Sequence, residues 1–255
     1  MLEVRDVSKT YNSGTDMEQK VFENFSLTVP DGQFVSIVGS NGSGKTTLLN
    51  VICGSITIDS GDVLVDGASI LKKKEHQRCA QLGRVYQNPS AGTAPNLTML
   101  ENMALADNKG KSYGLTRCVD RRRIDAYKEE LRGLGLGLEE KLHVKMGALS
   151  GGQRQAVSLL MATMTPLKFL ILDEHTAALD PKTAQVIMEL TDRVVREKQL
   201  TALMVTHNLR YAVEYGDRVL MMDKGKAVVD RAGQDKRGTT VEELMEQFNR
   251  ISMTQ

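Results

Sequence analysis

The chain has no tryptophan, and aromatic residues make up only 4% of its 255 residues. A surface on which nucleic-acid bases stack needs aromatic side chains, so this composition disfavours single-strand binding. An excess of one charge is also missing, because 33 lysines and arginines face 32 aspartates and glutamates, a formal net charge of +1. Such a chain has no general field that would hold it on DNA or on an anionic membrane. We therefore expect no nucleic-acid partner, and phosphate binding must come from a local site.

Cysteine is scarce, with three residues and no C-x-x-C pair, which disfavours a zinc site or a disulfide framework and is typical of a reducing compartment. The most apolar stretch, 157–172, is interrupted by Pro166 and Lys168 and falls short of the ~20 residues of a spanning helix. The first residues, MLEVRDVSKTY, are acidic where a signal peptide would be basic and then apolar. The sequence thus predicts a globular protein that does not cross a membrane by itself.

Short apolar runs and helical spacings alternate along most of the chain. They predict strands near 2–7, 25–29, 34–38, 63–65, 169–172, 202–205 and 219–222, and helices over 46–53, 153–164 and 181–195. Between about 88 and 149 helical patterns dominate, as in 99–105 and 124–134. Thr240 and Glu243 predict a capping box for a last helix. The strand–helix–strand order favours parallel pairing, and we expect an α/β core with an inserted helical segment.

One segment matches the phosphate-loop pattern G-x-x-x-x-G-K-[ST]. It consists of Gly39, Ser40, Asn41, Gly42, Ser43, Gly44, Lys45 and Thr46. Glycines let backbone N–H groups converge on an anion, and the helix that follows directs its positive end to the same place. In this pattern Lys45 reaches the β- and γ-phosphates and the Thr46 hydroxyl ligates Mg²⁺. The segment predicts nucleoside triphosphate binding; a chance match in a glycine-rich turn is the alternative.

An apolar strand near 169–172 ends in two carboxylates, Asp173 and Glu174. Ligands bind at the carboxyl edge of a parallel sheet, so these side chains are expected where a nucleotide would lie. Asp173 suits the shell of Mg²⁺, directly or through water. Glu174 is the next residue and points differently, so it can polarise the water that attacks the γ-phosphate. The alternative is a strand that simply ends in charged residues at solvent.

The segment 149–153, LSGGQ, stands between these two motifs in the chain. With it, essentially the whole sequence resembles the ATP-binding cassette (ABC) ATPases, specifically the nucleotide-binding subunits of ABC transporters. The resemblance implies a P-loop NTPase core with a mostly parallel sheet, an N-terminal antiparallel β subdomain and an inserted α-helical subdomain. It implies a single ABC ATPase domain, 1–255, with a nucleotide-binding core at 1–87 and 165–232, a helical signature subdomain at 88–164 and a C-terminal helical tail at 233–255.

Further site residues follow from this resemblance. Tyr11 matches the aromatic residue that stacks on adenine, with Phe22 as the competing candidate. Gln87, in the segment VYQ, matches the glutamine that contacts Mg²⁺ and the attacking water. Glu174 matches the catalytic carboxylate, and His207 matches the switch histidine that stabilises the transferring phosphoryl group. The other implied nucleotide contacts are Thr47, Ser150, Gly151, Gly152 and Gln153, and the implied metal ligands are Thr46, Gln87 and Asp173.

The signature segment has a physical meaning of its own. A Ser-Gly-Gly turn that opens a helix is a second anion site, although an ordinary helix-capping turn would look the same. On one core the two anion sites are expected to lie too far apart to hold one γ-phosphate. The family solves this with a head-to-tail, two-fold dimer in which each signature completes the partner copy's site. Residues 178–180, Ala-Leu-Asp, match the loop that crosses that interface.

The resemblance also implies the cofactors, partners and location. ATP and Mg²⁺ are the expected cofactors, and a second copy of the chain is the expected partner. A membrane permease is expected to dock near 87–100, and an extracellular solute-binding protein to act indirectly through it. These partners imply a peripheral position on the cytoplasmic face of the cell membrane.

Two positions depart from the common pattern of the family. His175 stands where proline usually follows the catalytic glutamate, and it is interpreted either as a tolerated loop change or as a titratable group near the γ-phosphate. The segment 88–95, NPSAGTAP, is longer and richer in glycine and proline than is usual. Both features resemble a bacterial importer subgroup that handles amino acids or related small solutes.

Two other classes of protein are the alternatives. A soluble ABC ATPase of translation or DNA repair would need two cassettes in one chain or a long coiled coil between the motifs, and neither is in the sequence. A non-hydrolysing binding module would show degraded motifs, whereas Lys45, Asp173 and Glu174 are all present.

Overall fold

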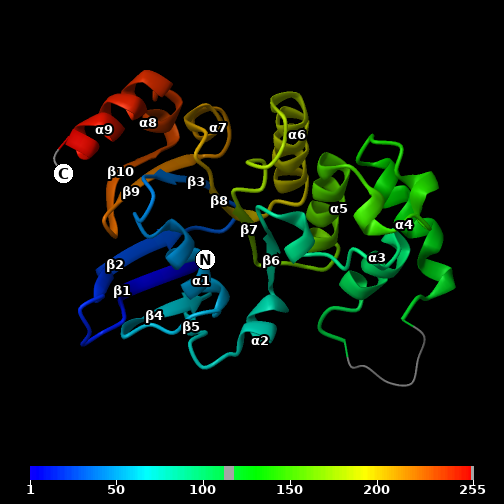
Figure 1. The fold of residues 1–255 in the computed structure, drawn as a ribbon, viewed down its shortest axis with the longest axis horizontal. Coiled ribbons are helices and arrows are strands. Elements are labelled where there is room, and N and C mark those ends of the chain that lie inside the picture. Colours follow the sequence, from blue (N-terminus) through cyan, green and yellow to red (C-terminus); the bar gives the residue numbers. More distant parts are fainter. Residues whose placement is uncertain (112–117, 254–255) are drawn as a thin grey trace. The chain divides into compact units, whose positions relative to one another are not determined.

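The computed structural model describes residues 1–111 and 118–253 (Figure 1). The chain forms two compact units, unit 1 with Met1–Cys79 and Gln199–Gln255, and unit 2 with Ala80–Lys198. Residues 112–117 of the expected helical subdomain and 254–255 of the expected tail lie outside the described part. The expected subdomain boundaries, 87/88, 164/165 and 232/233, stay predictions.

Unit 1 contains two sheets. Its strands are β1 (Leu2–Tyr11), β2 (Gln19–Val29), β3 (Phe34–Gly39), β4 (Ser60–Val65), β5 (Ala68–Ser69), β8 (Thr201–Val205), β9 (Arg218–Asp223) and β10 (Lys226–Ala232). Its helices are α1 (Lys45–Cys53), α2 (Glu75–Cys79), α7 (Leu209–Glu214), α8 (Gly233–Arg237) and α9 (Val241–Met253). The first sheet is antiparallel with the order β2-β1-β4-β5. In the second, β3 lies between β8 and β9 and is parallel to both, while β10 pairs with β9 antiparallel.

The first sheet explains why period-2 alternation in its sequence is imperfect. The pairing of β1 with β2 shifts register after Val4 and again after Val7. Asp6 in β1 and Asn24 in β2 adopt the left-handed conformation, with φ of 46° and 53°. Such irregularities rotate the side chains that follow, so strict alternation cannot persist along the strand.

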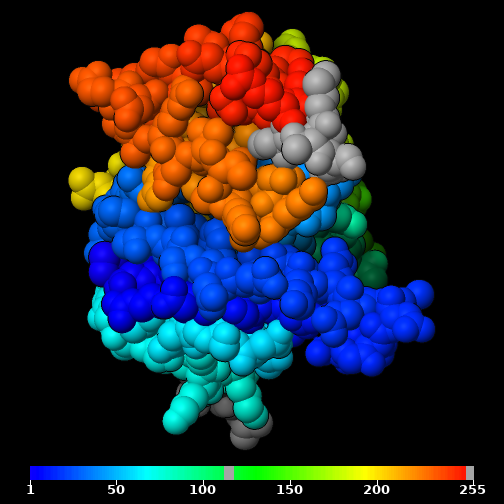
Figure 2. All heavy atoms as spheres, turned by 90° about the vertical axis from the view of Figure 1, so that its left-hand side faces the viewer, coloured from blue at the N-terminus to red at the C-terminus, as the bar shows by residue number. Residues whose placement is uncertain are grey.

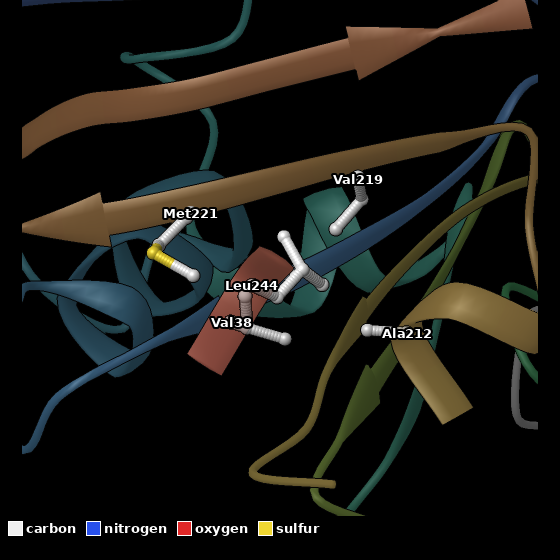
Figure 3. Packing of buried hydrophobic residues seen from close by; sticks show 5 residues of the cluster. All are labelled: Val38, Ala212, Val219, Met221 and Leu244. Atoms are coloured by element: carbon white, nitrogen blue, oxygen red, sulfur yellow. The ribbon is translucent and has the colours of Figure 1, made fainter. Parts of the chain in front are cut away.

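The second sheet supplies the core of unit 1. All residues of β3 and β8 are buried, which is the pattern of parallel strands covered on both faces. Figure 3 shows one cluster of this core, with side chains from β3, α7, β9 and α9 converging: Val38, Ala212, Val219, Met221 and Leu244. In the space-filling view of Figure 2, the orange and red segments of β10 and α9 lie above the blue segments of β1 and β2, all of them in unit 1. The carboxyl ends of β3 and β8 share one edge of the sheet, where the loops after them meet.

Unit 2 combines a parallel strand pair with helices. Its strands are β6 (Leu82–Val85) and β7 (Phe169–Asp173), and its α-helices are α3 (Met99–Asp107), α4 (Ile124–Arg132), α5 (Gly151–Thr163) and α6 (Pro181–Glu197). Single 3₁₀ turns are η1 (Pro89–Ala91), η2 (Arg121–Arg123), η3 (Glu139–Lys141) and η4 (Met146–Ala148). α5 packs on α3, α4, α6 and β6, and it is buried along most of its length because neighbours cover several of its faces.

The predicted α/β class and the main elements are confirmed. α5 begins at Gly151 and not at Gln153, because Ser150 is the residue that caps the helix. The capping box predicted for the last helix is only half present. The Thr240 hydroxyl accepts from the backbone N–H of Glu243, but the Glu243 carboxylate binds Arg231. Within the described residues, no helix combines the length and the apolar character needed to cross a bilayer.

Candidate functional site

The predicted phosphate loop of unit 1 runs from the end of β3 into α1. The ammonium nitrogen of Lys45 is buried and donates to the carbonyl oxygens of Gly39 and Ser40, each over 2.8 Å. The loop therefore curls around one positive charge at the N-terminus of a nine-residue helix. Backbone N–H groups, the helix dipole and a lysine at one place form a site for a polyphosphate. Along the rest of the motif, Ser43 and Gly44 are buried, Thr47 is half-buried, and the exposed residues are Asn41, Gly42 and Thr46.

Close packing beneath the loop explains one of its glycines. Gly44 precedes α1 with φ of 101°, and a β-carbon there would lie 2.9 Å from the ring of Phe22. The Phe22 ring stacks on Phe25 with centroids 4.9 Å apart and is 1% exposed. Phe22 is thus a core residue under the loop, with no face left for a base. Tyr11 is half-buried at the end of β1, and the Lys9 ammonium lies 5.3 Å from its ring centroid; its contact with adenine stays a prediction.

The turn between β9 and β10 supports the phosphate loop. This support was not predicted from the sequence. The N–H of Gly225 donates to the carbonyl of Ser43 over 3.1 Å, and the hydroxyl of Ser40 donates to Asp223 Oδ1 over 3.3 Å. Lys224 and Gly225 both have positive φ, as a two-residue hairpin turn requires. The segment DKGK after an apolar run indicates a turn in the sequence. Nothing in the sequence indicates that this turn contacts a loop about 180 residues earlier.

His207 follows β8 at the edge of the sheet where the phosphate loop follows β3. The side chain is exposed. It lines a pocket of about 320 Å³ together with Gly39, the first residue of the loop, and with residues of α7 and α9. The structure thus brings the predicted switch histidine close to the predicted phosphate loop, as expected for loops that follow adjacent parallel strands.

In unit 2 the strand β7 ends at Asp173, the first of the two predicted acidic residues, and Glu174 follows it. Asp173 accepts a hydrogen bond from Arg84 Nη2 of the neighbouring strand β6 over 2.7 Å. Glu174 adopts φ of 48°, a conformation that is uncommon for a residue with a side chain. Its carbonyl accepts from the N–H of Ala177, which closes a turn. A turn thus begins at Glu174, directly after the strand, and the different roles of the two carboxylates stay a prediction.

His175 corrects one interpretation. The side chain is 2% exposed, and its Nε2 lies 3.0 Å from the hydroxyl oxygen of Thr191 in α6. Burial lowers the pKa of His175 to about 4. The residue is therefore a neutral part of the core of unit 2, and the reading of it as a group that titrates near the γ-phosphate is wrong.

Gln87 is exposed on the segment that follows β6. The backbone next to it is fixed, because the carbonyl of Tyr86 accepts from Nε2 of Gln155, a fully buried residue of α5. Arg154 of the same helix donates to the hydroxyl of Ser90 over 3.2 Å. The helix that begins with the signature is thus hydrogen-bonded to the segment that carries Gln87, a connection not predicted from sequence.

The signature opens α5 with a complete capping box. The hydroxyl of Ser150 accepts from the N–H of Gln153, and the Gln153 side chain accepts from the N–H of Ser150. Gly151 is exposed at the start of the helix. Gly152 is buried, and a β-carbon there would lie 2.2 Å from the methyl carbon of Thr183.

This close approach brings the signature to the start of α6. Asp180 caps α6 by accepting from the N–H of Thr183 over 3.1 Å. Hydrogen bonds from the side chain and the backbone of Thr183 lower the pKa of Asp180 below its usual range. The segment 178–180 and the signature therefore lie together in unit 2.

The residues expected to hold Mg²⁺ are Thr46, Gln87 and Asp173. A hydroxyl, an amide and a carboxylate are hard oxygen donors, which Mg²⁺ prefers and zinc does not. Among the described residues, no three His, Cys, Asp or Glu side chains form a cluster able to hold a metal ion. Mg²⁺ at nucleotide sites binds a few protein oxygens together with phosphates and water, so each of these three donors is of a kind that suits the metal, and their joint role stays a prediction.

A phosphate loop after a buried strand, an acidic end of a parallel strand and a signature helix that is capped by Ser150 and begins with two glycines define an ATP-binding cassette ATPase. The model of the family described as ABC transporter matches residues 22–177, which is more than half of the chain. The chain belongs to this family: it is the ATP-binding and ATP-hydrolysing part of a transporter.

The similarity to known proteins extends over nearly the whole chain. A "Tyrosine transport ATP-binding protein" of Clostridioides difficile (strain R20291) is 47% identical over 248 residues, which cover 97% of this chain and 98% of the relative. Among solved structures, the cassette MJ0796 in a dimeric post-hydrolysis state with ADP and Pi is 30% identical, with a TM-score of 0.77, and covers 94% of this chain and all of that one. Another dimeric structure of the same cassette gives a TM-score of 0.78 with the same identity and coverage.

Proposed function

We propose that two copies of this chain pair head to tail around ATP and drive a separate membrane permease, which imports a small solute. The two copies would sit on the cytoplasmic face of the cell membrane. Each nucleotide would lie between the phosphate loop of one copy and the signature of the other. The dimeric states of MJ0796 support the pairing of two copies, because that cassette is 30% identical and all of it is covered by this chain.

One observation carries the proposal. The chain has two separate places where backbone N–H groups gather at the start of a helix, α1 with Lys45 in unit 1 and α5 with Ser150 in unit 2. Gly151 at the second place is exposed, so a phosphate of a neighbouring molecule can reach it. Each copy has two anion sites and binds one triphosphate. Both sites are occupied when the signature of each copy contacts the triphosphate bound to the phosphate loop of its partner.

Each site residue would have its own role in the hydrolysis of ATP to ADP and phosphate. Lys45 holds the β- and γ-phosphates, and Tyr11 stacks on adenine. Glu174 accepts a proton from the attacking water, Gln87 orients that water, and His207 stabilises the negative charge of the transferring phosphoryl group. The remaining nucleotide contacts are Gly39, Ser40, Asn41, Gly42, Ser43, Gly44, Thr46, Thr47, Gly151, Gly152 and Gln153. Mg²⁺, held by Thr46, Gln87 and Asp173, supplies charge neutralisation when it is bound.

The transported solute belongs to the class of amino acids in this proposal. The 47% identical relative is named for tyrosine transport, and a solute-binding protein outside the cell would deliver the solute to the permease. The permease would dock near 87–100, where the described surface includes Leu97 with 37% exposure. Asn102, which is 1% exposed, holds this segment by accepting from the N–H of Ala94 and donating to its carbonyl.

The pairing is tested with Glu174→Gln, which keeps the shape of the side chain and removes its basicity. ATP hydrolysis should fall by about 10²–10⁴-fold while ATP binding stays unchanged. Light scattering at saturating ATP should show a dimer for this variant and a monomer for the wild type. Glu23→Gln, on the exposed face of β2, is the matched control and should behave as the wild type. A monomeric Glu174→Gln with ATP bound contradicts the composite site, and normal hydrolysis contradicts the role of Glu174.

The solute is tested in the organism that encodes the chain. Deletion of the gene should abolish uptake of radiolabelled tyrosine, and the wild-type gene should restore it. Glu174→Gln expressed at the same level should not restore it, which separates loss of ATP hydrolysis from loss of the protein. Uptake of tyrosine at the normal rate in the deletion strain would exclude tyrosine as the solute.

A further inference from the structure

β6 carries an arginine in a largely apolar setting. The register with β7 places Arg84 opposite Ile171 and Val85 opposite Leu172. The neighbours Leu82 and Val85 are buried, and the side chain of Arg84 is only 13% exposed. A guanidinium group loses much of its hydration at such a position, and this cost is offset only by a carboxylate and good hydrogen bonds.

The carboxylate that offsets the charge of Arg84 belongs to Asp173. Nη2 donates to Oδ2 over 2.7 Å, and the Asp173 side chain is 15% exposed. The guanidinium carbon lies 4.7 Å from the centroid of the Tyr86 ring, which restrains the orientation of the group. A short, charge-assisted hydrogen bond with little access to solvent is only weakly screened by salt. The negative charge of Asp173 is therefore largely compensated within the protein.

We propose that Arg84 is a positioning residue that holds Asp173 by one oxygen and weakens its attraction for a divalent cation. This inference rests on the proposed role of Asp173 as a metal ligand. A cation that approaches Asp173 meets the positive charge of Arg84 a few ångströms away, and two like charges repel. Asp173 would then contribute little to holding a divalent cation, and the phosphate oxygens of a bound nucleotide would have to supply most of the affinity.

A matched control is available in another strand. Arg218 of β9 is 15% exposed and forms an ion pair with Asp230 of β10. Arg218→Met thus removes a similarly buried strand arginine from an ion pair that involves none of the proposed site residues, although its partner Asp230 is 44% exposed and Asp173 only 15%. Any general effect of losing such a pair on folding will appear in this variant as well.

The test measures metal binding directly. Mn²⁺ is a paramagnetic substitute for Mg²⁺, and electron paramagnetic resonance reports its free concentration during a titration of the ATP-bound protein. All proteins carry Glu174→Gln, so that ATP is not consumed. In this background Arg84→Met should lower the half-saturating Mn²⁺ concentration about tenfold, because a repelling charge is removed. Arg84→Lys, which keeps the charge, should stay within about threefold of the parent, and Arg218→Met should equal it.

The outcomes separate this inference from the proposed function. Unchanged or weaker Mn²⁺ binding by Arg84→Met overturns the role of Arg84. If that variant does not fold, Arg84→Gln, which keeps an N–H donor without the charge, decides the question by the same titration. Asp173→Asn should weaken Mn²⁺ binding. If it leaves Mn²⁺ binding unchanged, Asp173 is not a metal ligand and the proposed site is wrong, whatever Arg84 does.

Discussion

The imidazole of His175 lies 3.0 Å from the hydroxyl oxygen of Thr191, and both side chains are buried. Thr191 donates its own hydroxyl hydrogen to the carbonyl of Ile187 over 2.7 Å. Its oxygen therefore accepts from the Nε2–H of a neutral histidine, which defines the tautomer. Through this bond the residue after Glu174 is tied to the middle of α6, in a chain position where the family usually has proline.

This bond predicts a pH dependence of stability. Burial lowers the pKa of His175 from 6.5 to about 4. Between these values the unfolded chain binds a proton that the folded chain does not, so the free energy of unfolding falls as the pH falls. From pH 7 to pH 5 the contribution of this one group is a loss of about 2 kcal/mol. Urea unfolding at both pH values should show His175→Gln losing about 2 kcal/mol less than the wild type.

The exposed residue His76 of α2 provides the control for that experiment. His76→Gln makes the same substitution at an exposed position and therefore reports any effect on stability that is not specific to the buried site. If the free energy of unfolding depends equally on pH in the wild type and in His175→Gln, burial does not lower the pKa of His175.

Gly152 is predicted to tolerate no side chain. A β-carbon there would lie 2.2 Å from the methyl carbon of Thr183, and overpacking of this kind costs about 1–3 kcal/mol. Gly152→Ala should therefore lower the free energy of unfolding by that amount, and adding Thr183→Ala should recover part of the loss. Gly238→Ala is the control, since a β-carbon there meets nothing closer than 3.8 Å. Additive effects of the two substitutions would contradict a direct contact.

Gly225 supports the phosphate loop, and its replacement should affect both stability and ATP binding. Gly225 has φ of 75°, and a β-carbon there would lie 1.8 Å from the carbonyl oxygen of Val21. Gly67 has almost the same φ, 77°, with no atom within 4 Å of that position. Gly67→Ala should cost about 1 kcal/mol from backbone strain alone, whereas Gly225→Ala adds the clash and should cost about 1–3 kcal/mol more.

ATP binding separates the two glycine variants further. The N–H of Gly225 donates to the carbonyl of Ser43 in the phosphate loop. Gly225→Ala should displace this turn, so the variant should bind ATP more weakly than the wild type. Gly67→Ala should bind ATP as the wild type does. Calorimetric titration measures both affinities, and equal affinities would show that the turn does not support the loop.

Lys45 is predicted to dominate the affinity for the triphosphate. Its buried ammonium lies at the centre of the loop formed by Gly39 and Ser40. A charge-assisted contact contributes about 1.5–3 kcal/mol, so Lys45→Ala should weaken ATP binding by roughly 10- to 150-fold. Lys226→Ala removes an exposed lysine of β10 and should change the affinity less than twofold. Similar losses in both variants would point to a general effect of charge and not to a specific contact.

Local patterns in the sequence were sufficient wherever function depends on neighbours in the chain. The phosphate loop and the carboxylates at the end of β7 each involve residues within a few positions. Backbone geometry over such distances follows from residue type, because glycine permits the turn, serine caps the helix and buried strands need branched apolar residues. The α/β fold and its order of elements were predicted for the same reason.

The environment of each side chain was decided only by tertiary structure. Arg84 and Asp173 are 89 positions apart, and Ser40 and Asp223 are 183 apart. No periodicity or motif records which distant residue will lie beside a given charge. His175 shows the consequence, since its identity suggested a group that titrates at the nucleotide, whereas packing against α6 keeps it neutral. The chemistry of the motifs thus comes from local sequence, and the charge state and support of the motif residues come from long-range packing.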